Sequence, residues 1–186
     1  MTEEQVFENI DYTSDPLPGK EFDNCSFVNC NFSNLNMSEL TMLECSFEGC
    51  NMSAVNFHSA TLNDVAFKQC NLLGVDFSEC NQILLSFSFE ECRLDLCSFY
   101  SMNLKETSFK KCSAKEADFI ESNLSKSVFD ECDLEGAIFE HTVLEETDLR
   151  SAENFNIDPD LNQLNKAKFT HLGLPGLLGK YDIEIE

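Results

Sequence analysis

The sequence predicts a repeat fold, a solenoid in which one short unit is stacked many times. Three observations lead to this prediction. The 186 residues include 17 Phe, no Trp and only 7 Gly, an unusual composition for a globular enzyme. A large apolar residue recurs at every fifth position over most of the chain, and a small or β-branched residue stands two positions before it. Neither the 3.6-residue period of an α-helix nor the 2-residue period of an ordinary strand produces this spacing.

The large residues alternate in type along the array. Phe recurs at intervals of ten, and Leu, Met or once Ala stands halfway between successive Phe residues. Upstream, from Phe22 to Met42, the step of five persists without the alternation. The Phe residues that we expect to form the core are Phe47, Phe57, Phe67, Phe77, Phe89, Phe99, Phe109, Phe119, Phe129 and Phe139.

The step of five breaks once, between Phe77 and Phe89, which stand twelve residues apart instead of ten. An insertion of two residues within 78–83 restores the pattern and places Leu84 in a Leu position. We therefore predict a bulge or a short loop at 78–83.

Strings such as ECSFEGCNMSAVNF and EADFIESNLSKSVF resemble the repeats of the pentapeptide-repeat family, whose pattern is roughly A/C/S/V/T-D/N-L/F-x-x. The resemblance covers about residues 20–154, roughly 26 repeats. It implies an all-β fold, a right-handed quadrilateral β-helix with four pentads in each coil, here followed by a short C-terminal helical or capping segment. Coils of 20 residues would place Phe on two opposite sides and Leu on the other two. At about 4.8 Å per coil the rod would be roughly 31 Å long.

All ten Cys stand in the small position of a pentad, and a buried Cys behaves as a small hydrophobic residue. Stacked thiols would lie near disulfide distance. However, parallel side chains in register give poor disulfide geometry, and no His shares the register, so we expect free core thiols and no metal site. The expected columns are Cys30, Cys50 and Cys70, then Cys92, Cys112 and Cys132.

The two ends of the chain are expected to close the array. Residues 1–19 are predicted to cap the first coil, because a solenoid must cover its terminal strand edges. In the segment 155–186, Asp158-Pro159 predicts the start of a short helix, Pro175 is expected to begin a turn that reaches Leu178, and residues 181–186 alternate like a strand.

The C-terminal segment carries too many apolar residues for a free tail. It either caps the last coil or joins two copies of the chain. In the quinolone-resistance members of the family this segment joins two rods tip to tip, so the resemblance favours a homodimer. The residues expected at the interface are Phe169, Leu172, Leu174, Leu177, Leu178 and Tyr181.

The composition excludes several classes of function. With 12 Lys and Arg against 34 Asp and Glu, the formal charge is −22, which argues against binding to nucleic acid or to an anionic membrane. The N-terminus lacks the features of a signal peptide and no apolar run is long enough to span a membrane, so we expect a cytoplasmic protein. We find no nucleophile, phosphate-loop, zinc or CxxC motif, and His58, His141 and His171 have no ligand partners at suitable spacing. We therefore expect neither an enzyme nor a cofactor.

The acidic residues concentrate toward the C-terminal end of the array. Residues 116–160 hold 14 acids against Lys126 and Arg150, a net charge of 2 − 14 = −12. A solvated surface that keeps the rod soluble is one interpretation, and imitation of duplex DNA is the other. The residues expected to bind a partner are Glu116, Asp118, Glu121, Asp130, Glu131, Asp133, Glu135, Glu140, Glu145, Glu146 and Asp148.

Resemblance to the Qnr-type and MfpA-type members implies a type II topoisomerase, DNA gyrase or topoisomerase IV, as that partner. The chain lacks the longer projecting loops of Qnr proteins, which counts against protection from quinolones more than against topoisomerase binding. The alternative is an interaction scaffold or an immunity protein with another bacterial partner.

Overall fold

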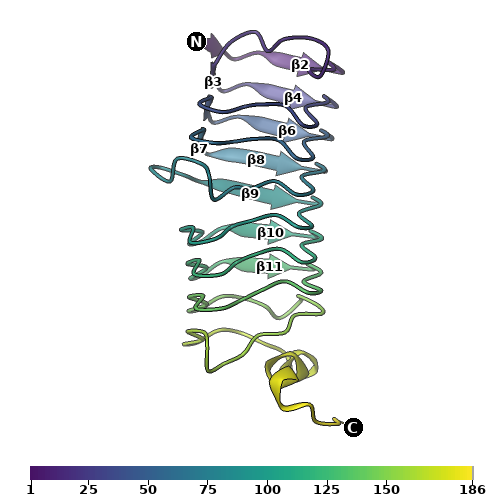
Figure 1. Cartoon of the computed structure of the whole chain (residues 1–186), viewed down its shortest axis with the longest axis vertical. Coiled ribbons are helices and arrows are strands. Elements are labelled where there is room, and N and C mark those ends of the chain that lie inside the picture. Colours follow the sequence, from purple (N-terminus) through teal and green to yellow (C-terminus); the bar gives the residue numbers. More distant parts are fainter. Residues whose placement is uncertain (186) are drawn as a thin grey trace.

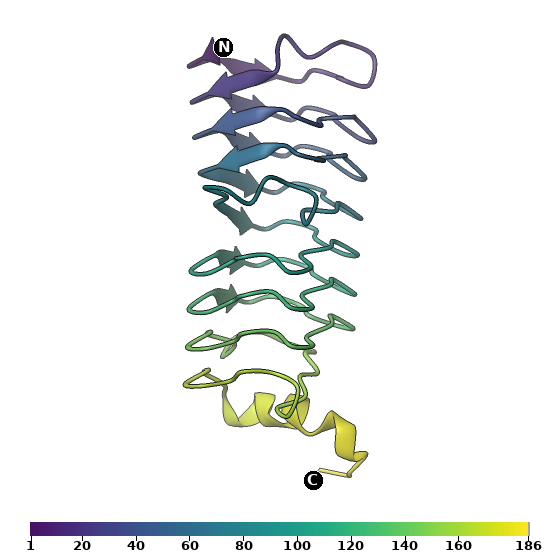
Figure 2. The same cartoon turned by 60° about the vertical axis from the view of Figure 1, so that its left-hand side comes forward.

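The chain winds into a rod of stacked coils in the computed structural model, which describes residues 1–185 (Figures 1 and 2). Successive coils pair in parallel at a spacing of 20 residues, as Phe27 does with Phe47 and Met42 with Leu62. The predicted fold, a quadrilateral parallel β-helix, is confirmed.

Two sheets of short strands lie on adjacent sides of the rod, which we number in chain order within a coil. Side 1 carries a sheet of four strands: β1 (Thr2–Glu3), β3 (Glu21–Asp23), β5 (Thr41–Leu43) and β7 (Thr61–Asn63). Side 2 carries a sheet of seven strands: β2 (Val6–Glu8), β4 (Ser26–Val28), β6 (Ser46–Glu48), β8 (Val65–Lys68), β9 (Phe87–Glu90), β10 (Ser108–Lys110) and β11 (Val128–Asp130).

Sides 3 and 4 are held by isolated bridges between coils instead of longer strands. Side 3 contains the bridge from Asn51 to Asn71, and side 4, opposite side 2, contains the bridges that join Asp76, Ser98 and Asp118. The side-2 ladder runs from Phe7 to Lys168 in eight steps, so at about 4.8 Å a step it is about 38 Å long.

The rings of the core Phe residues stack from coil to coil on sides 2 and 4. The centroids of Phe47 and Phe67 lie 5.3 Å apart on side 2, and those of Phe57 and Phe77 lie 5.9 Å apart on side 4. All ten Phe residues expected in the core are buried. Seven of the ten rings stack on a ring in the coil above and in the coil below, and the interior is filled without a bore.

The preference for Asn or Asp directly before the large residue has a local cause. The side-chain oxygen of such a residue accepts the N–H two positions later, as Asp118 Oδ1 does from Ile120 at 2.8 Å. The residue after that N–H then turns the corner with a left-handed backbone, for example Ala54 with φ 53° and Glu121 with φ 59°. Its own N–H bonds to the next coil, from Ala54 N to Leu73 O at 2.9 Å, which offsets the cost of that conformation.

The predicted insertion is a projecting loop between β8 and β9, but Leu84 does not occupy a core position (Figure 1). Ile83 and Leu84 are 72% and 74% exposed at the loop. The interior is filled instead by Phe87, whose ring lies 5.3 Å from that of Phe77 and 5.2 Å from that of Phe89. The prediction for Leu84 was wrong because it followed the step of five through a loop that leaves the register.

The two expected Cys columns form one column, which corrects the sequence prediction. The coil that contains the loop has 22 residues, so Asn71 pairs with Arg93 and Cys70 stacks against Cys92. All ten thiols are free and buried, and all except Cys80 donate to backbone carbonyls, as Cys92 Sγ does to Phe67 O at 3.3 Å. Burial raises the pKa of Cys97 to about 12. The thiols therefore pack as small core residues.

Residues 1–19, expected to be a separate cap, form a further coil of the helix. β1 and β2 pair in register with β3 and β4, and the ring of Phe7 stacks on that of Phe27 at 5.0 Å. The repeat is hard to detect here because Thr2 and Tyr12 stand where Phe or Leu is usual.

The coils also continue beyond residue 154. Val143 pairs with Gln163 and Asp148 with Lys168, so the helix expected after Asp158 does not form. Two 3-10 helices follow, η1 (His171–Leu177) and η2 (Gly179–Tyr181). Residues 182–185 adopt no regular secondary structure, and the expected strand extends to residue 186, outside the described residues. Across residues 1–185 we find no helix that is both long and apolar enough to span a membrane.

Candidate functional site

The eleven acids expected to bind a partner surround the rod instead of forming one patch. Because each pentad occupies a different side, neighbours in sequence point in different directions. Side 1 carries Glu145 and Glu146, side 2 Asp130, Glu131 and Asp148, side 3 Glu116, Asp133 and Glu135, and side 4 Asp118, Glu121 and Glu140.

On sides 2 and 3 three of the six acids, Asp133, Glu135 and Asp148, form ion pairs with Lys or Arg. Lys115 Nζ lies 2.9 Å from Asp133 Oδ2 and 2.7 Å from Glu135 Oε2. Arg150 Nη2 lies 2.6 Å from Asp148 Oδ2, and its hydrogen bonds lower the pKa of that carboxyl group. These sides are therefore of mixed charge.

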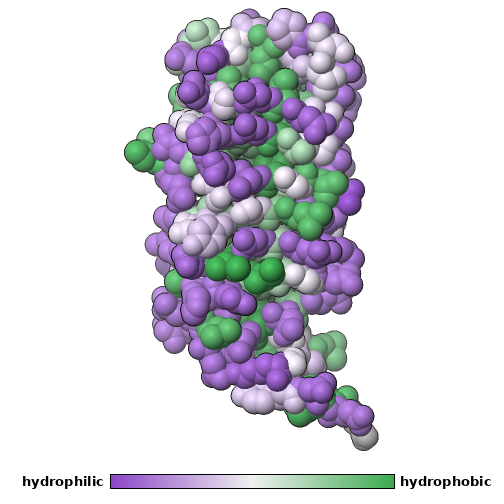
Figure 3. All heavy atoms as spheres, in the orientation of Figure 1, coloured by the Kyte–Doolittle hydropathy of each residue, from purple (hydrophilic) through white to green (hydrophobic). Residues whose placement is uncertain are grey.

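Side 2, which lies at the back of the rod in Figure 1, also carries exposed apolar groups. Figure 3 shows the opposite face, side 4, where apolar groups lie among hydrophilic ones as well. Val6 and Val128 of its sheet are both exposed, and Lys110 Nζ lies 2.7 Å from Glu90 Oε1. A surface of this mixed kind offers a cationic partner a weaker field than an unbroken acidic surface does.

Side 4 differs because its acids have no Lys or Arg among them. We call Asp76, Glu79, Asp118, Glu121 and Glu140 the acidic strip. Between residues 56 and 141, the described residues that project from this side include no Lys or Arg.

The contacts of the acidic strip are with neutral groups and one His. Tyr100 donates its hydroxyl to Glu121 Oε2 at 3.1 Å, and His58 Nδ1 lies 2.5 Å from Glu79 Oε2. The strip is bounded at its C-terminal end by Lys180, which pairs with Asp158 at 2.7 Å. Sequence counting missed Asp76 and Glu79 because they lie far upstream of residues 116–160, and only the register of the coils brings them onto this side.

The charge per unit length of the rod is close to that of duplex DNA. Residues 1–169 hold 11 Lys and Arg against 31 Asp and Glu, a net charge of 11 − 31 = −20. Spread over roughly 40 Å, this gives about one net negative charge per 2 Å, against about 1.7 Å in B-DNA. A protein surface built to bind DNA would meet a comparable charge on this rod.

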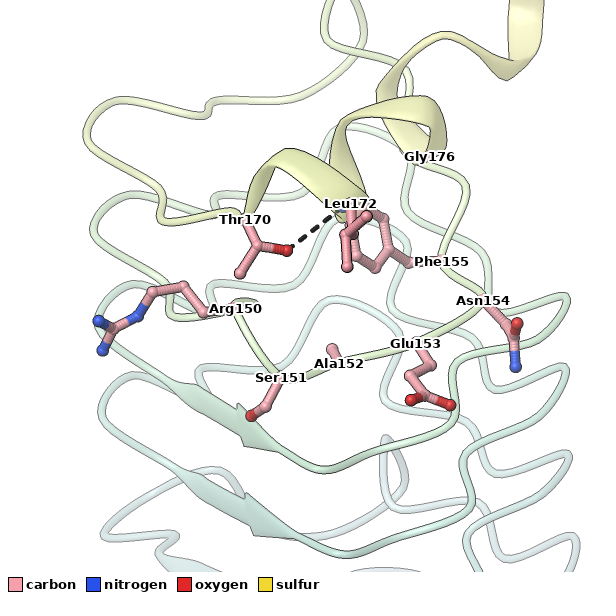
Figure 4. Close-up of a pocket in the computed structure, with 10 residues that line it drawn as sticks. Arg150, Ser151, Ala152, Glu153, Asn154, Phe155, Thr170, Leu172 and Gly176 are labelled. Atoms are coloured by element: carbon pink, nitrogen blue, oxygen red, sulfur yellow. Dashed lines mark hydrogen bonds between the residues drawn. The ribbon is translucent and has the colours of Figure 1, made fainter. Parts of the chain in front are cut away.

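A hollow lies where the last coil meets η1 (Figure 4). It has a volume of about 390 Å³ and is lined by residues such as Phe155, Thr170 and Leu172. Thr170 caps η1 by accepting the N–H of Gly173 at 3.3 Å, and Gly176 lies so close to Phe155 that an added Cβ would be 2.5 Å from its carbonyl oxygen. In Figure 4 the Arg150 side chain points away from the hollow. The lining combines apolar residues such as Phe155 and Leu172 with polar ones such as Thr170, and it contains no nucleophile paired with a base.

The residues expected at a dimer interface divide into two groups. Phe169, Leu177 and Leu178 are half-buried, and the first two pack against the core at the end of the rod. Leu172 is 93% exposed, and Leu174 and Tyr181 are also exposed. The segment thus covers the last coil and still presents apolar side chains to solvent. Within residues 1–185 no group of three or more His, Cys, Asp or Glu side chains is placed to hold a metal ion.

Comparisons with known proteins agree on the repeat architecture. The family model described as a pentapeptide repeat region matches residues 20–88 and 82–169. The rod is similar to a solved structure of QnrB1, a plasmid-mediated fluoroquinolone resistance protein, with a TM-score of 0.52 and 17% identity, covering 100% of this chain and 99% of that one.

A second similar structure is HetL, a pentapeptide repeat protein involved in heterocyst differentiation regulation from the cyanobacterium Nostoc sp. strain PCC 7120. Its TM-score is 0.53 at 14% identity, covering 89% of this chain and 84% of that one. No curated protein matches by sequence. At these identities the structural likeness establishes the fold.

Proposed function

The chain belongs to the pentapeptide-repeat family, and from this premise we propose that it is a non-catalytic DNA mimic that binds the DNA-binding surface of a type II topoisomerase, DNA gyrase or topoisomerase IV. The observation that carries the proposal is the acidic strip, a side of the rod on which five acids follow one another without Lys or Arg. A chromosomal enzyme as partner also implies that the protein acts in the cytoplasm.

Electrostatics explains why such a rod would compete with DNA. The DNA-binding surface of a topoisomerase is basic, because it neutralises phosphates, and the rod presents a similar number of charges per unit length. Binding would arise mainly from steering and from pairing of Asp118, Glu121 and Glu140 with Lys and Arg of the enzyme. The likeness to QnrB1, itself a fluoroquinolone resistance protein, supports this class of partner.

The same proposal includes a homodimer joined at the C-terminal ends. Leu172 is exposed beside the hollow that Phe155 lines, so a two-fold pairing would let Leu172 of each copy enter the hollow of the other. A dimer of two rods would be about 75 Å long, with the C-terminal acids near its centre. Leu172→Asp should convert a dimer to the 21.1 kDa monomer in light scattering, and a wild-type protein that is already monomeric would refute this part.

The main test is inhibition of gyrase supercoiling by added protein, with and without ciprofloxacin. We expect inhibition at about 0.05 M salt that weakens strongly at about 0.2 M, because exposed charges are screened. The triple variant Asp118→Lys, Glu121→Lys, Glu140→Lys should lose inhibition by at least about tenfold.

A matched variant on side 2 distinguishes the effect of the acidic strip on inhibition from the effect of net charge. Glu91→Lys, Asp130→Lys, Glu131→Lys changes the formal charge by the same amount on the opposite side of the rod. We expect this variant to retain most of the inhibition. Equal loss in both variants would contradict a role for the acidic strip, and absence of inhibition by the wild-type protein would favour a scaffold for another bacterial partner.

A further inference from the structure

The two ends of the rod are closed to different degrees. At the C-terminal end η1 and its apolar residues pack over the last coil (Figure 2). At the N-terminal end β1 and β2 form the outermost strands of their sheets, and within residues 1–185 no strand pairs with their outer edges. The first coil is therefore an open sheet edge on sides 1 and 2.

The backbone of this edge is arranged to receive another strand. In the inner coils, the residue before each large residue donates its N–H to the preceding coil, as Ser26 N does to Gln5 O and Ser46 N to Cys25 O, both at 2.9 Å. Val6 holds the same position in the first coil, where the described chain supplies no preceding coil.

The carbonyl groups repeat the same pattern. Val28 O accepts the N–H of Asn9 from the coil before it at 2.9 Å, and Asp23 O accepts that of Glu4 at 3.0 Å. The equivalent carbonyls of the first coil, those of Glu8 and Glu3, point toward the open end by the same register. An incoming parallel strand in register would find these donors and acceptors at alternate residues.

The side chains leave an apolar platform on the same edge. One face of the Phe7 ring stacks on Phe27, but Phe7 is half-exposed, whereas Phe27 below it is fully buried. Val6 next to it is 63% exposed. An aromatic or aliphatic side chain arriving in register would extend the ring column of side 2.

Side 3 of the first coil is closed by the chain itself, which limits the edge to β1 and β2. Ser14 N and Asp15 N donate to Asp11 O at 3.1 and 3.0 Å, so the chain turns back after Asp11. Tyr12 there is only 4% exposed. Further on, Pro16 has no N–H to offer a neighbouring strand.

The charges around the edge select its occupant. Residues 1–19 hold Glu3, Glu4, Glu8, Asp11 and Asp15 and no Lys or Arg. A second copy would bring the same acids edge to edge, and like charges at that distance repel. A strand that carries Lys or Arg would meet complementary charge.

We propose that the edge formed by β1 and β2 is a site of β-strand addition, at which an extended basic segment of another protein pairs with Thr2–Glu8 and places an apolar residue on the ring of Phe7. Backbone hydrogen bonds supply the register and the acids supply the preference for a basic segment. The site lies at the opposite end of the rod from the hollow and does not depend on topoisomerase binding.

The test uses a synthetic peptide of about ten residues, two pentads of alternating Lys, Val and Phe, labelled for fluorescence anisotropy. We expect saturable binding together with slowed amide hydrogen exchange at Val6. The same peptide with Glu in place of Lys, and one with N-methylated backbone, should each bind at least about tenfold more weakly.

A pair of variants with equal change of charge completes the test. Glu3→Lys, Glu4→Lys, Glu8→Lys should weaken peptide binding by at least about tenfold, whereas Asp118→Lys, Glu121→Lys, Glu140→Lys should bind it as the wild type does. Equal loss in both variants, full binding of the N-methylated peptide, or unchanged exchange at Val6 would overturn the proposal. Circular dichroism checks that both variants remain folded.

Discussion

Replacing one ring in the middle of the Phe column should cost far more than replacing the ring at its open end. Phe109 is fully buried and stacks on Phe89 at 5.4 Å and on Phe129 at 4.6 Å. Phe→Ala in a core costs about 3–5 kcal/mol, and each aromatic pair adds about 0.5–1.5 kcal/mol beyond burial. Phe109→Ala should therefore lower the free energy of unfolding by about 5 kcal/mol.

Phe7 supplies the matched comparison because it belongs to the same column. It is half-exposed and stacks only on Phe27 in that column, so Phe7→Ala should cost about 2 kcal/mol. Phe109→Leu keeps most of the buried volume and loses the stacking, which should cost about 2 kcal/mol.

Urea denaturation followed by far-ultraviolet circular dichroism measures all three variants. The free energies are comparable if each variant unfolds with the slope of the wild type. If Phe109→Ala and Phe7→Ala lower the free energy of unfolding equally, the idea that rings stacked on both faces hold the coils together is refuted. A Phe109→Leu variant as unstable as Phe109→Ala would show that ring geometry matters more than volume.

Three further predictions follow from individual contacts. Because all ten thiols are buried, iodoacetamide should label them no faster than global unfolding allows, as mass spectrometry can measure; rapid labelling of folded protein would contradict this. Hydrogen bonds from Arg150 lower the pKa of Asp148 in the folded state, so this carboxylate stabilises the fold above its unfolded pKa of about 3.9 and the contribution disappears as the pH falls through the lower folded value. Asp148→Asn should therefore lose up to about 1 kcal/mol at pH 7 and match the wild type near pH 2 in urea titrations, and a constant difference across that range would contradict the assignment. Gly176→Ala brings a Cβ to 2.5 Å from Phe155 O and should cost about 2 kcal/mol, whereas a thermal melt unchanged from wild type would show that η1 shifts freely.

The period of the large residues predicts the fold because every coil repeats the same five-residue pattern of inward-pointing side chains. Phe47 and Phe67 stand 20 apart in the sequence and stack in the structure, so the pattern alone identifies the column. The same signal fails at the ends. Thr2 and Tyr12 take positions usually held by Phe or Leu, although the backbone pairs in register and Phe7 and Tyr12 stack on Phe27 and Phe32.

The candidate site was less accessible to sequence analysis because charge was counted along the chain and not around the rod. Glu140 and Glu145 are five residues apart and lie on different sides, whereas Asp76 and Asp118 lie on one side although 42 residues separate them. Which acids remain unpaired depends on cations from neighbouring coils, such as Lys115 beside Asp133. The sequence therefore predicts an acidic rod but not its acidic strip.

The loop between β8 and β9 shows why the register of the whole rod matters for the surface. With strict 20-residue coils, Asp76 would stand beside Leu96; the 22-residue coil pairs it with Ser98 and so keeps it in line with Asp118. The two extra residues project from side 1 as Ile83 and Leu84, and the other three sides continue without a break. An insertion that is not absorbed by a loop would turn inward-pointing side chains outward in all later pentads and move each acid to another position. Continuity of the acidic strip thus depends on a loop on a different side of the rod, which absorbs the extra residues and leaves the core columns aligned.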